Sequence, residues 1–374
     1  MKKNLLYALT AVAMLTGCAK SDVVDSEINK EGNLIGFSTY KNISRGNPVD
    51  DNSEFLTKGN TFGVTAFINT EGVTSPYMGI TTEGIEIIFD GTKWTYANTS
   101  DQAYWPTKDE TLDFYAYAPY NHPSTTKTFD KANGLTLEYT VPAEEAKQVD
   151  LMYASALEQT KPTDKNSVTL PFKHALTQVH FKVGTKTTNL KVDIAANGIQ
   201  IHNLKNSGSL TMKSNQIDDA AWTLTGDATA KYTVTSDAVT GDYTDGTEAN
   251  PYTEIGNANN ALMLLPQEFV AGDGTAENTG AYLTISCKIY QVLADGTTKI
   301  YLHGDAEAFA PITVGISSAL PAEEGGEATQ IWQRNKKVTY NLLFGAGDGV
   351  LFPIEFATEV EEWQPADGGV IEPK

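Results

Sequence analysis

Cys18 is the residue for which the local sequence predicts a definite chemistry. It follows Leu15-Thr16-Gly17, whose small residues match the lipobox that bacterial lipoprotein processing recognises. Cleavage between Gly17 and Cys18 would leave the cysteine thiol to carry a diacylglycerol and its new amine to carry a third acyl chain, such as palmitate. Several acyl chains anchor a protein firmly, because each buried methylene contributes ~0.8 kcal/mol.

The segment before Cys18 supports this prediction. Lys2 and Lys3 form a basic start, and the apolar run from Leu5 to Leu15 is shorter than the ~20 residues of a membrane-spanning helix. The pattern is typical of a secretory signal peptide, which we place at residues 1–17. The chain is therefore expected to reach the cell surface as a lipid-anchored precursor at the outer membrane. The alternative is an ordinary signal peptide followed by a chance cysteine.

The sequence contains no set of residues that points to catalysis. None of the five histidines has zinc-ligand spacing, and G-x-S-x-G and phosphate-loop motifs are absent. His174 and His180 are an even number of residues apart and could share a strand face, but a polar sheet face explains them better than a metal site. Turns likewise explain Asp295-Gly296 and Asp348-Gly349 better than calcium loops do. We predict no enzyme activity, no metal and no cofactor.

The remaining candidates for chemistry read better as core residues. Cys287 shares one strand face with Leu283, Ile285 and Ile289, which predicts a buried, inert thiol. The tryptophans could line a sugar platform, but each lies in or beside a strand-like run, so packing explains them more simply. They are Trp94, Trp105, Trp222, Trp332 and Trp363.

Composition narrows the class of protein. The chain has 374 residues and a net charge of −20, and such an acidic chain repels phosphate backbones, so nucleic acid is not expected as a partner. Only two cysteines are present, so stability must come from core packing rather than from a disulfide framework.

Two-residue alternation of apolar and polar side chains dominates the chain and predicts an all-β fold. The clearest unit is a hairpin of residues 85–89 and 93–96 around Asp90-Gly91-Thr92. Helical candidates are short, at 142–147 and 322–331, and residues 237–260 and 271–280 read as surface loops. Further strands are expected at 112–118, 135–141, 167–171, 174–183, 190–195, 198–204, 208–213, 222–224, 232–235, 261–265, 282–293, 298–303, 337–344 and 354–360.

Short strands at this spacing favour β-sandwiches over a parallel sheet. A polar stretch near residues 158–166 precedes a fresh run of strands, so we place a domain boundary there. The prediction is an N-terminal sandwich at 46–165 and a C-terminal sandwich at 166–374.

Several segments of the chain resemble the fimbrillin family, the type V pilin subunits of anaerobic gut and oral bacteria. Each segment alone is a weak match, but their order and spacing together are specific. The resemblance implies two tandem transthyretin-like β-sandwich domains and a structural role in surface fimbriae. The matching segments are the lipobox at Cys18, Tyr104-Trp105-Pro106, 112–119, 149–154, 170–176, 264–267, Trp332 with 337–340, and 360–363.

The resemblance also implies a route of maturation. A surface arginine-specific protease would cut between Arg45 and Gly46, removing a propeptide of residues 18–45 that contains the first strand. A strand from another subunit would then fill the gap. Leu34 to Thr39 suits such a temporary strand, because Ile35 and Phe37 fall on one face.

The C-terminal end leaves the position in the fimbria open. After Trp363, residues 364–374 are short and carry one apolar pair, Val370-Ile371, where a dedicated donor arm would be longer and more apolar. The ranking is shaft subunit, then tip, then anchor, with host glycans or proteins as further partners in adhesion. The alternative function is a monomeric outer-membrane lipoprotein that binds glycans.

Overall fold

The computed structural model describes residues 33–39, 55–79, 83–106, 110–163, 167–212, 221–256, 261–319, 330–345 and 355–362, the last of these by backbone alone. Within these ranges the chain is all-β, as predicted, with only two short 3-10 turns, η1 (Thr99–Asp101) and η2 (Glu145–Lys147). None of the helices in the described ranges is long and apolar enough to cross a bilayer.

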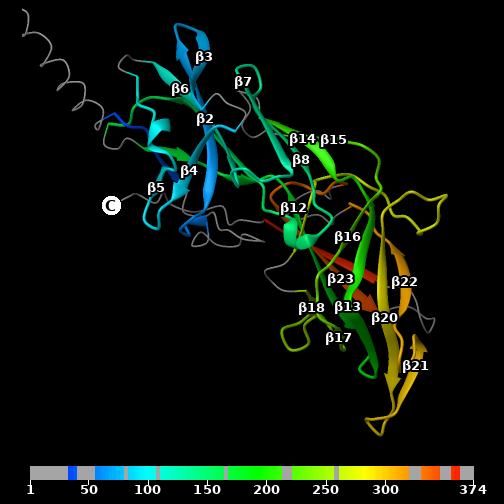
Figure 1. Cartoon of the computed structure of the whole chain (residues 1–374). Helices are drawn as coiled ribbons and strands as arrows, with labels where there is room; N and C mark the ends of the chain where they lie inside the picture. Colours follow the sequence, from blue (N-terminus) through cyan, green and yellow to red (C-terminus); the bar gives the residue numbers. More distant parts are fainter. Residues whose placement is uncertain are drawn as a thin grey trace, which may run out of the picture.

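Two sheets form one end of the molecule (Figure 1). The larger has seven strands in the order β11-β9-β6-β2-β4-β5, with β3 on β2, and β1 forms a separate parallel pair with β10. Their bounds are β1 (Gly36–Thr39), β2 (Thr61–Thr70), β3 (Val73–Met78), β4 (Ile85–Phe89), β5 (Trp94–Tyr96), β6 (Thr111–Ala118), β9 (Met152–Gln159), β10 (Ser167–Leu170) and β11 (Lys173–His174).

Three further sheets contain the remaining strands of the described residues, and the longest strands, β13 and β20, lie toward the opposite end (Figure 1). Their orders are β15-β14-β8-β7, β18-β12-β23-β24 with β19 on β12, and β16-β13-β20-β21 with β17 and β22 at its sides. The bounds are β7 (Thr125–Asp130), β8 (Gly134–Thr140), β12 (Thr177–Thr185), β13 (Leu190–Leu204), β14 (Ser207–Met212), β15 (Ala221–Thr225), β16 (Ala230–Thr233), β17 (Val239–Gly241), β18 (Thr253–Ile255), β19 (Leu262–Leu264), β20 (Tyr282–Val292), β21 (Lys299–His303), β22 (Ala310–Gly315), β23 (Lys336–Phe344) and β24 (Glu355–Glu362).

The seven-stranded sheet is covered on both faces. Along β6, Phe114 and Ala116 enter one apolar cluster, while Tyr115 and Tyr117 enter a second. The first cluster lies under β1 and β10. The second runs from Phe67 into the far sheets and includes residues on both sides of position 165. A division into two domains at that position stays a prediction.

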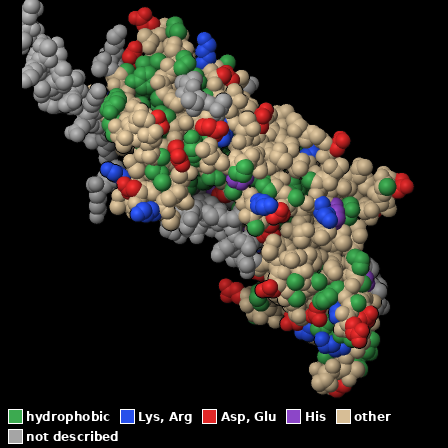
Figure 2. Space-filling model, in the orientation of Figure 1, with side chains coloured by type: hydrophobic (Ala, Val, Ile, Leu, Met, Phe, Trp, Pro, Cys, Tyr) green, Lys and Arg blue, Asp and Glu red, His purple; other side chains and the backbone are tan. Residues whose placement is uncertain are grey.

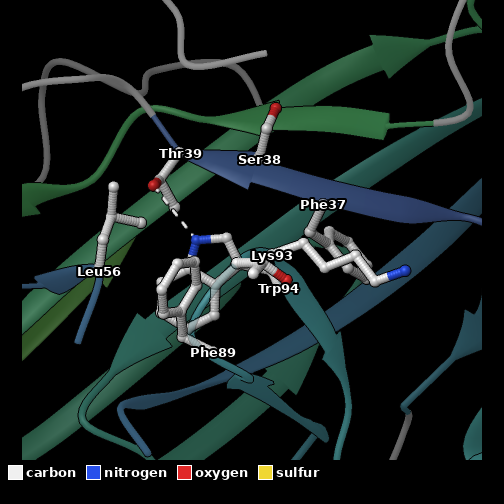
Figure 3. Close-up of a pocket in the computed structure, with 8 residues that line it drawn as sticks. Phe37, Ser38, Thr39, Leu56, Phe89, Lys93 and Trp94 are labelled. Carbon is white, nitrogen blue, oxygen red and sulfur yellow. Dashed lines mark hydrogen bonds between the residues drawn. The ribbon is translucent and has the colours of Figure 1, made fainter. Parts of the chain in front are cut away.

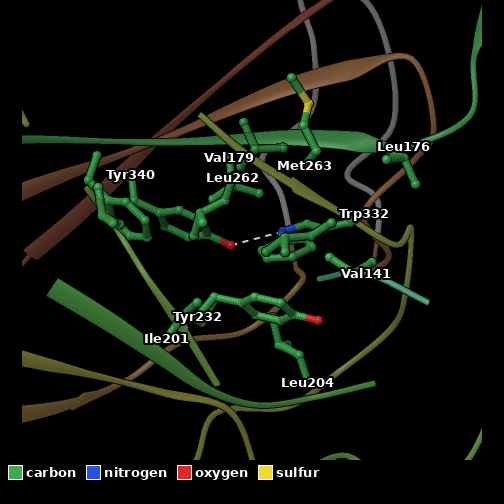
Figure 4. Packing of buried hydrophobic residues seen from close by; sticks show 14 of the residues in the cluster. Val141, Leu176, Val179, Ile201, Leu204, Tyr232, Leu262, Met263, Trp332 and Tyr340 are labelled. Carbon is green, nitrogen blue, oxygen red and sulfur yellow. Dashed lines mark hydrogen bonds between the residues drawn. The ribbon is translucent and has the colours of Figure 1, made fainter. Parts of the chain in front are cut away.

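Trp332 lies inside the second cluster and is fully buried (Figure 4). Its indole N–H donates a hydrogen bond to the Tyr340 hydroxyl over 3.0 Å, so the one polar atom of the ring is satisfied in an apolar surrounding. Trp94 and Trp105 are also buried, which confirms packing roles for these three residues. Trp222 is partly buried, and Trp363 lies outside the described residues.

Most predicted strands are present, and the hairpin of β4 and β5 has its turn where expected, with the Asp90 carboxylate accepting from the Thr92 and Lys93 amides. The turn at Asp295-Gly296 is also confirmed, whereas Asp348-Gly349 lies outside the described residues. Residues 142–147 form only the short turn η2, and most of 322–331 is outside the described ranges.

Some local predictions were wrong. Residues 190–204 form one strand, β13, with a register shift between Ile194 and Ile199, rather than two strands. The predicted loop at 237–260 contains β17 and β18, because these short polar segments gain backbone partners at the edges of β13 and β12. β12 and β23 pair in parallel although most other pairs are antiparallel.

Most charged side chains of the described residues remain at the surface. On the face in Figure 2, Asp and Glu side chains are interspersed with Lys and Arg side chains at both ends of the molecule. The buried exceptions therefore stand out, and two of them are histidines, His174 and His180.

His180 predicts a pH dependence of stability. It lies on β12, 9% exposed, and burial together with Lys337 and Lys182 lowers its pKa to about 3. The unfolded chain, with an ordinary histidine pKa of about 6.5, binds the proton first as the pH falls. The free energy of unfolding is therefore expected to decrease between pH 6.5 and 3, by on the order of 5 kcal/mol at ~1.4 kcal/mol per pKa unit.

Urea unfolding at successive pH values tests this expectation. His180→Gln should make the free energy of unfolding depend less on pH between 6.5 and 3. The pKa values of His122 and His202 are also lowered by burial, so their contribution to the pH dependence remains in both proteins. A variant profile parallel to that of the parent chain would show that His180 is not the group responsible.

Candidate strand-acceptor groove

β1 lies in a groove whose walls come from distant parts of the chain. It runs parallel to β10, with Phe37 opposite Val168. At its start the Ile35 amide donates to the Ala103 carbonyl over 2.9 Å, and the Trp105 amide donates to the Asn33 carbonyl over 2.8 Å. Residues 33–35 are thus held by the segment 103–105, and residues 36–39 by β10.

The side chains of β1 complete the smaller core. Ile35 is fully buried and Phe37 is 5% exposed, which confirms that the two share the buried face. The centroid of the Phe37 ring lies 5.9 Å from that of Phe62 and 6.1 Å from that of Phe114, in edge-to-face contacts. Such aromatic pairs add to the stabilisation that comes from burial alone.

Two hydrogen bonds reach β1 from β5. The Tyr96 hydroxyl donates to the Ile35 carbonyl over 2.9 Å, and the Trp94 indole N–H donates to Thr39 Oγ1 over 3.3 Å. Burial raises the pKa of Tyr96, so its hydroxyl stays protonated and remains a donor at physiological pH.

β10 has β1 as its only ladder partner among the described strands. The rest of its support comes from side chains and from the segment that follows it. Val168 and Leu170 are buried in the same core as β1, and Phe172 packs against Phe62 at 5.4 Å. The wall formed by β10 therefore depends on contacts beyond its own backbone.

A buried hydrogen bond between two polar side chains anchors the segment that follows β10. His174 Nδ1 lies 2.8 Å from the Asp150 carboxylate, and both side chains are almost completely buried. Beside this contact the Ala175 amide donates to the Leu151 carbonyl over 2.8 Å. The pair joins two segments of the sequence resemblance, 149–154 and 170–176.

The sequence pattern does not predict this contact. His174 and His180, which could have shared a strand face, lie on different strands, β11 and β12. No group of potential metal ligands occurs in the parts of the chain that the structure describes. One feature of the sequence could have predicted the contact: Asp150 and His174 each interrupt an apolar run. A polar side chain that is buried in such a run needs a hydrogen-bond partner.

The structure does not describe the predicted processing residues. Gly17, Cys18, Arg45 and Gly46 fall outside the described residues, so lipidation and both cleavages stay predictions. Cys287 is fully buried, as predicted, and burial raises its pKa to about 12, which disfavours the reactive thiolate.

The fold and the groove define an all-β protein whose first strand completes a core made by much later strands. The chain belongs to the fimbrillin-like family, whose model matches residues 48–363. The family resemblance seen in the sequence is thereby confirmed.

Individual relatives agree with this assignment. The chain is 26% identical over 223 residues to fimbrium subunit Fim1C of Phocaeicola vulgatus, a match that covers 52% of this chain and 57% of that protein. The crystal structure of a fimbrial protein from Bacteroides vulgatus superposes with a TM-score of 0.61 at 19% identity, covering 88% of this chain and 99% of the other. At that identity the superposition supports the fold alone.

Proposed function

We propose that this chain is a structural subunit of surface fimbriae whose β1 is a temporary strand. The precursor is exported, lipidated at Cys18 and cut between Arg45 and Gly46, and β1 then leaves with the propeptide. A strand of another subunit takes its place. The observation that carries this proposal is that Ile35 and Phe37 complete a core whose remaining residues lie after the predicted cleavage site.

Loss of β1 would create a strong binding site for a strand. It would uncover the apolar surfaces of Phe62 and Phe114 and leave β10 without its ladder partner. An exposed edge beside an apolar groove favours addition of a strand from another chain. At ~25 cal/mol per Å² of buried apolar surface, the replacement strand would be held by several kcal/mol before ordering costs.

For the place of the subunit in the fimbria the proposal keeps the order shaft, tip, anchor, with adhesion as the outcome of assembly. The last described strand, β24, pairs antiparallel with β23. The glycan-binding alternative has less support, because Trp94, Trp105 and Trp332 are buried and offer no surface platform.

Arg45→Ala tests the proposal directly. Without the arginine the surface protease has no cleavage site, so the chain should remain a lipidated monomer that retains β1. Electron microscopy of the cells and mass spectrometry of the N-terminus measure both consequences, and Lys41→Ala is the matched control that should mature normally. Polymers beginning at Gly46 in the Arg45→Ala strain would contradict this route.

A further inference from the structure

β1 leaves its third inward-facing position underfilled. The inward positions are Ile35, which directly precedes β1, and Phe37 and Thr39 within it, since alternate residues of an extended chain share a face. The first two carry large apolar side chains, whereas Thr39 is small and polar. It is nonetheless only 2% exposed, and its hydroxyl accepts the Trp94 N–H at 3.3 Å.

A pocket lies directly beside Thr39 (Figure 3). Its volume is about 50 Å³, well above the roughly 10–15 Å³ that one water-sized sphere requires. Trp94 and Phe89 lie on one side of it and Leu56 on another. The Trp94 and Phe89 rings pack against each other at 5.3 Å, so this wall is apolar and well supported. The pocket is continuous with the groove, because Phe37, Ser38 and Thr39 are themselves part of its lining.

We infer that this pocket is a subsite for the incoming strand of another subunit, filled by an aliphatic or aromatic side chain at the position that Thr39 holds in β1. The inference rests on the proposed replacement of β1. A strand with a larger apolar residue there would keep the contacts of Ile35 and Phe37 and add burial that β1 lacks. Each further buried methylene is worth about a fourfold change in a binding constant. The replacement strand would therefore outcompete β1.

The same chemistry explains why a small residue suits β1. A propeptide strand must hold the core closed during export and must later leave. A large side chain in the pocket would slow its departure. Thr39 keeps one hydrogen bond to Trp94 and leaves the apolar volume for the strand that follows.

The first measurement uses the uncleaved chain. Thr39→Leu should raise the urea midpoint of unfolding, because the leucine fills the pocket. Thr39→Val is the control: its shape matches threonine, so it fills no new space and should give no increase. Leu56→Phe, which occupies the pocket from the opposite wall, should abolish the gain from Thr39→Leu.

The second measurement uses the full chain after cleavage at Arg45 by an arginine-specific protease. Synthetic peptides of residues 33–39, with and without Thr39→Leu, compete for the groove. The Thr39→Leu peptide should displace β1 about four- to fifteenfold more effectively, as expected from one or two additional buried methylenes. Equal competition by the two peptides, with no gain in the uncleaved Thr39→Leu chain, would overturn the inference.

The two measurements separate this inference from the function on which it rests. If neither peptide displaces β1, replacement of the strand is contradicted. The stability of the uncleaved Thr39→Leu chain would still decide whether the pocket accepts a larger apolar side chain.

Discussion

Phe37→Ala is expected to destabilise the uncleaved chain by about 3–5 kcal/mol, the usual cost of removing a buried phenylalanine side chain. The ring is enclosed by Phe62, Tyr96 and Phe114, with ring centroids 5.9–6.1 Å away. Its neighbours belong to three separate strands of the sheet, which limits how far they can relax into the cavity. Urea unfolding of the purified precursor measures the loss.

The same substitution should have no effect on assembled subunits. If β1 leaves with the propeptide, residue 37 is absent from the polymer, and its stability cannot depend on that side chain. Phe114→Ala is the matched control, because Phe114 stays in the groove wall and should destabilise both forms. A polymer weakened by Phe37→Ala would mean that β1 is retained.

Asp150→Ala should also destabilise the chain, by about 1–3 kcal/mol, because it removes the buried hydrogen bond between Asp150 and His174 Nδ1. The loss of stability should be largest at β10, because the contact between Asp150 and His174 anchors the chain just after that strand. Hydrogen exchange should therefore accelerate at the Val168 and Leu170 amides more than in β20, whose ladder partners are independent of the pair.

Two controls identify the pair as the cause. His174→Ala should have a similar effect, and the double variant should cost less than the sum of the two single variants, because both remove one interaction. Glu144→Ala breaks the exposed pair with Lys147 and should change stability little. Fully additive losses from Asp150→Ala and His174→Ala would show that the two residues act independently.

The fold class could be predicted because its signal is local. A two-residue alternation places apolar side chains on one face, and this identified most strands, the face shared by Ile35 and Phe37, and the burial of Cys287. The turn at Asp90-Gly91 could be predicted for the same reason, since the Asp90 carboxylate accepts hydrogen bonds from amides only two and three residues further along the chain.

Strands with a weaker pattern were missed for a physical reason. β2 and β9 carry buried side chains on both faces, because the seven-stranded sheet has a core on each side. A strand buried on both faces loses its alternation. The short strands β17 and β18 are polar and exist through pairing with long neighbours.

The sequence by itself determined the all-β class, the family, and the apolar face of the first strand. Only the tertiary structure decided which strands pair: β1 with β10 across more than a hundred residues, and β12 with β23 in parallel. It also brought Asp150 to His174 and placed a pocket beside Thr39. Alternation fixes the face that a side chain takes, but the partner across the sheet depends on long-range packing that no local pattern encodes.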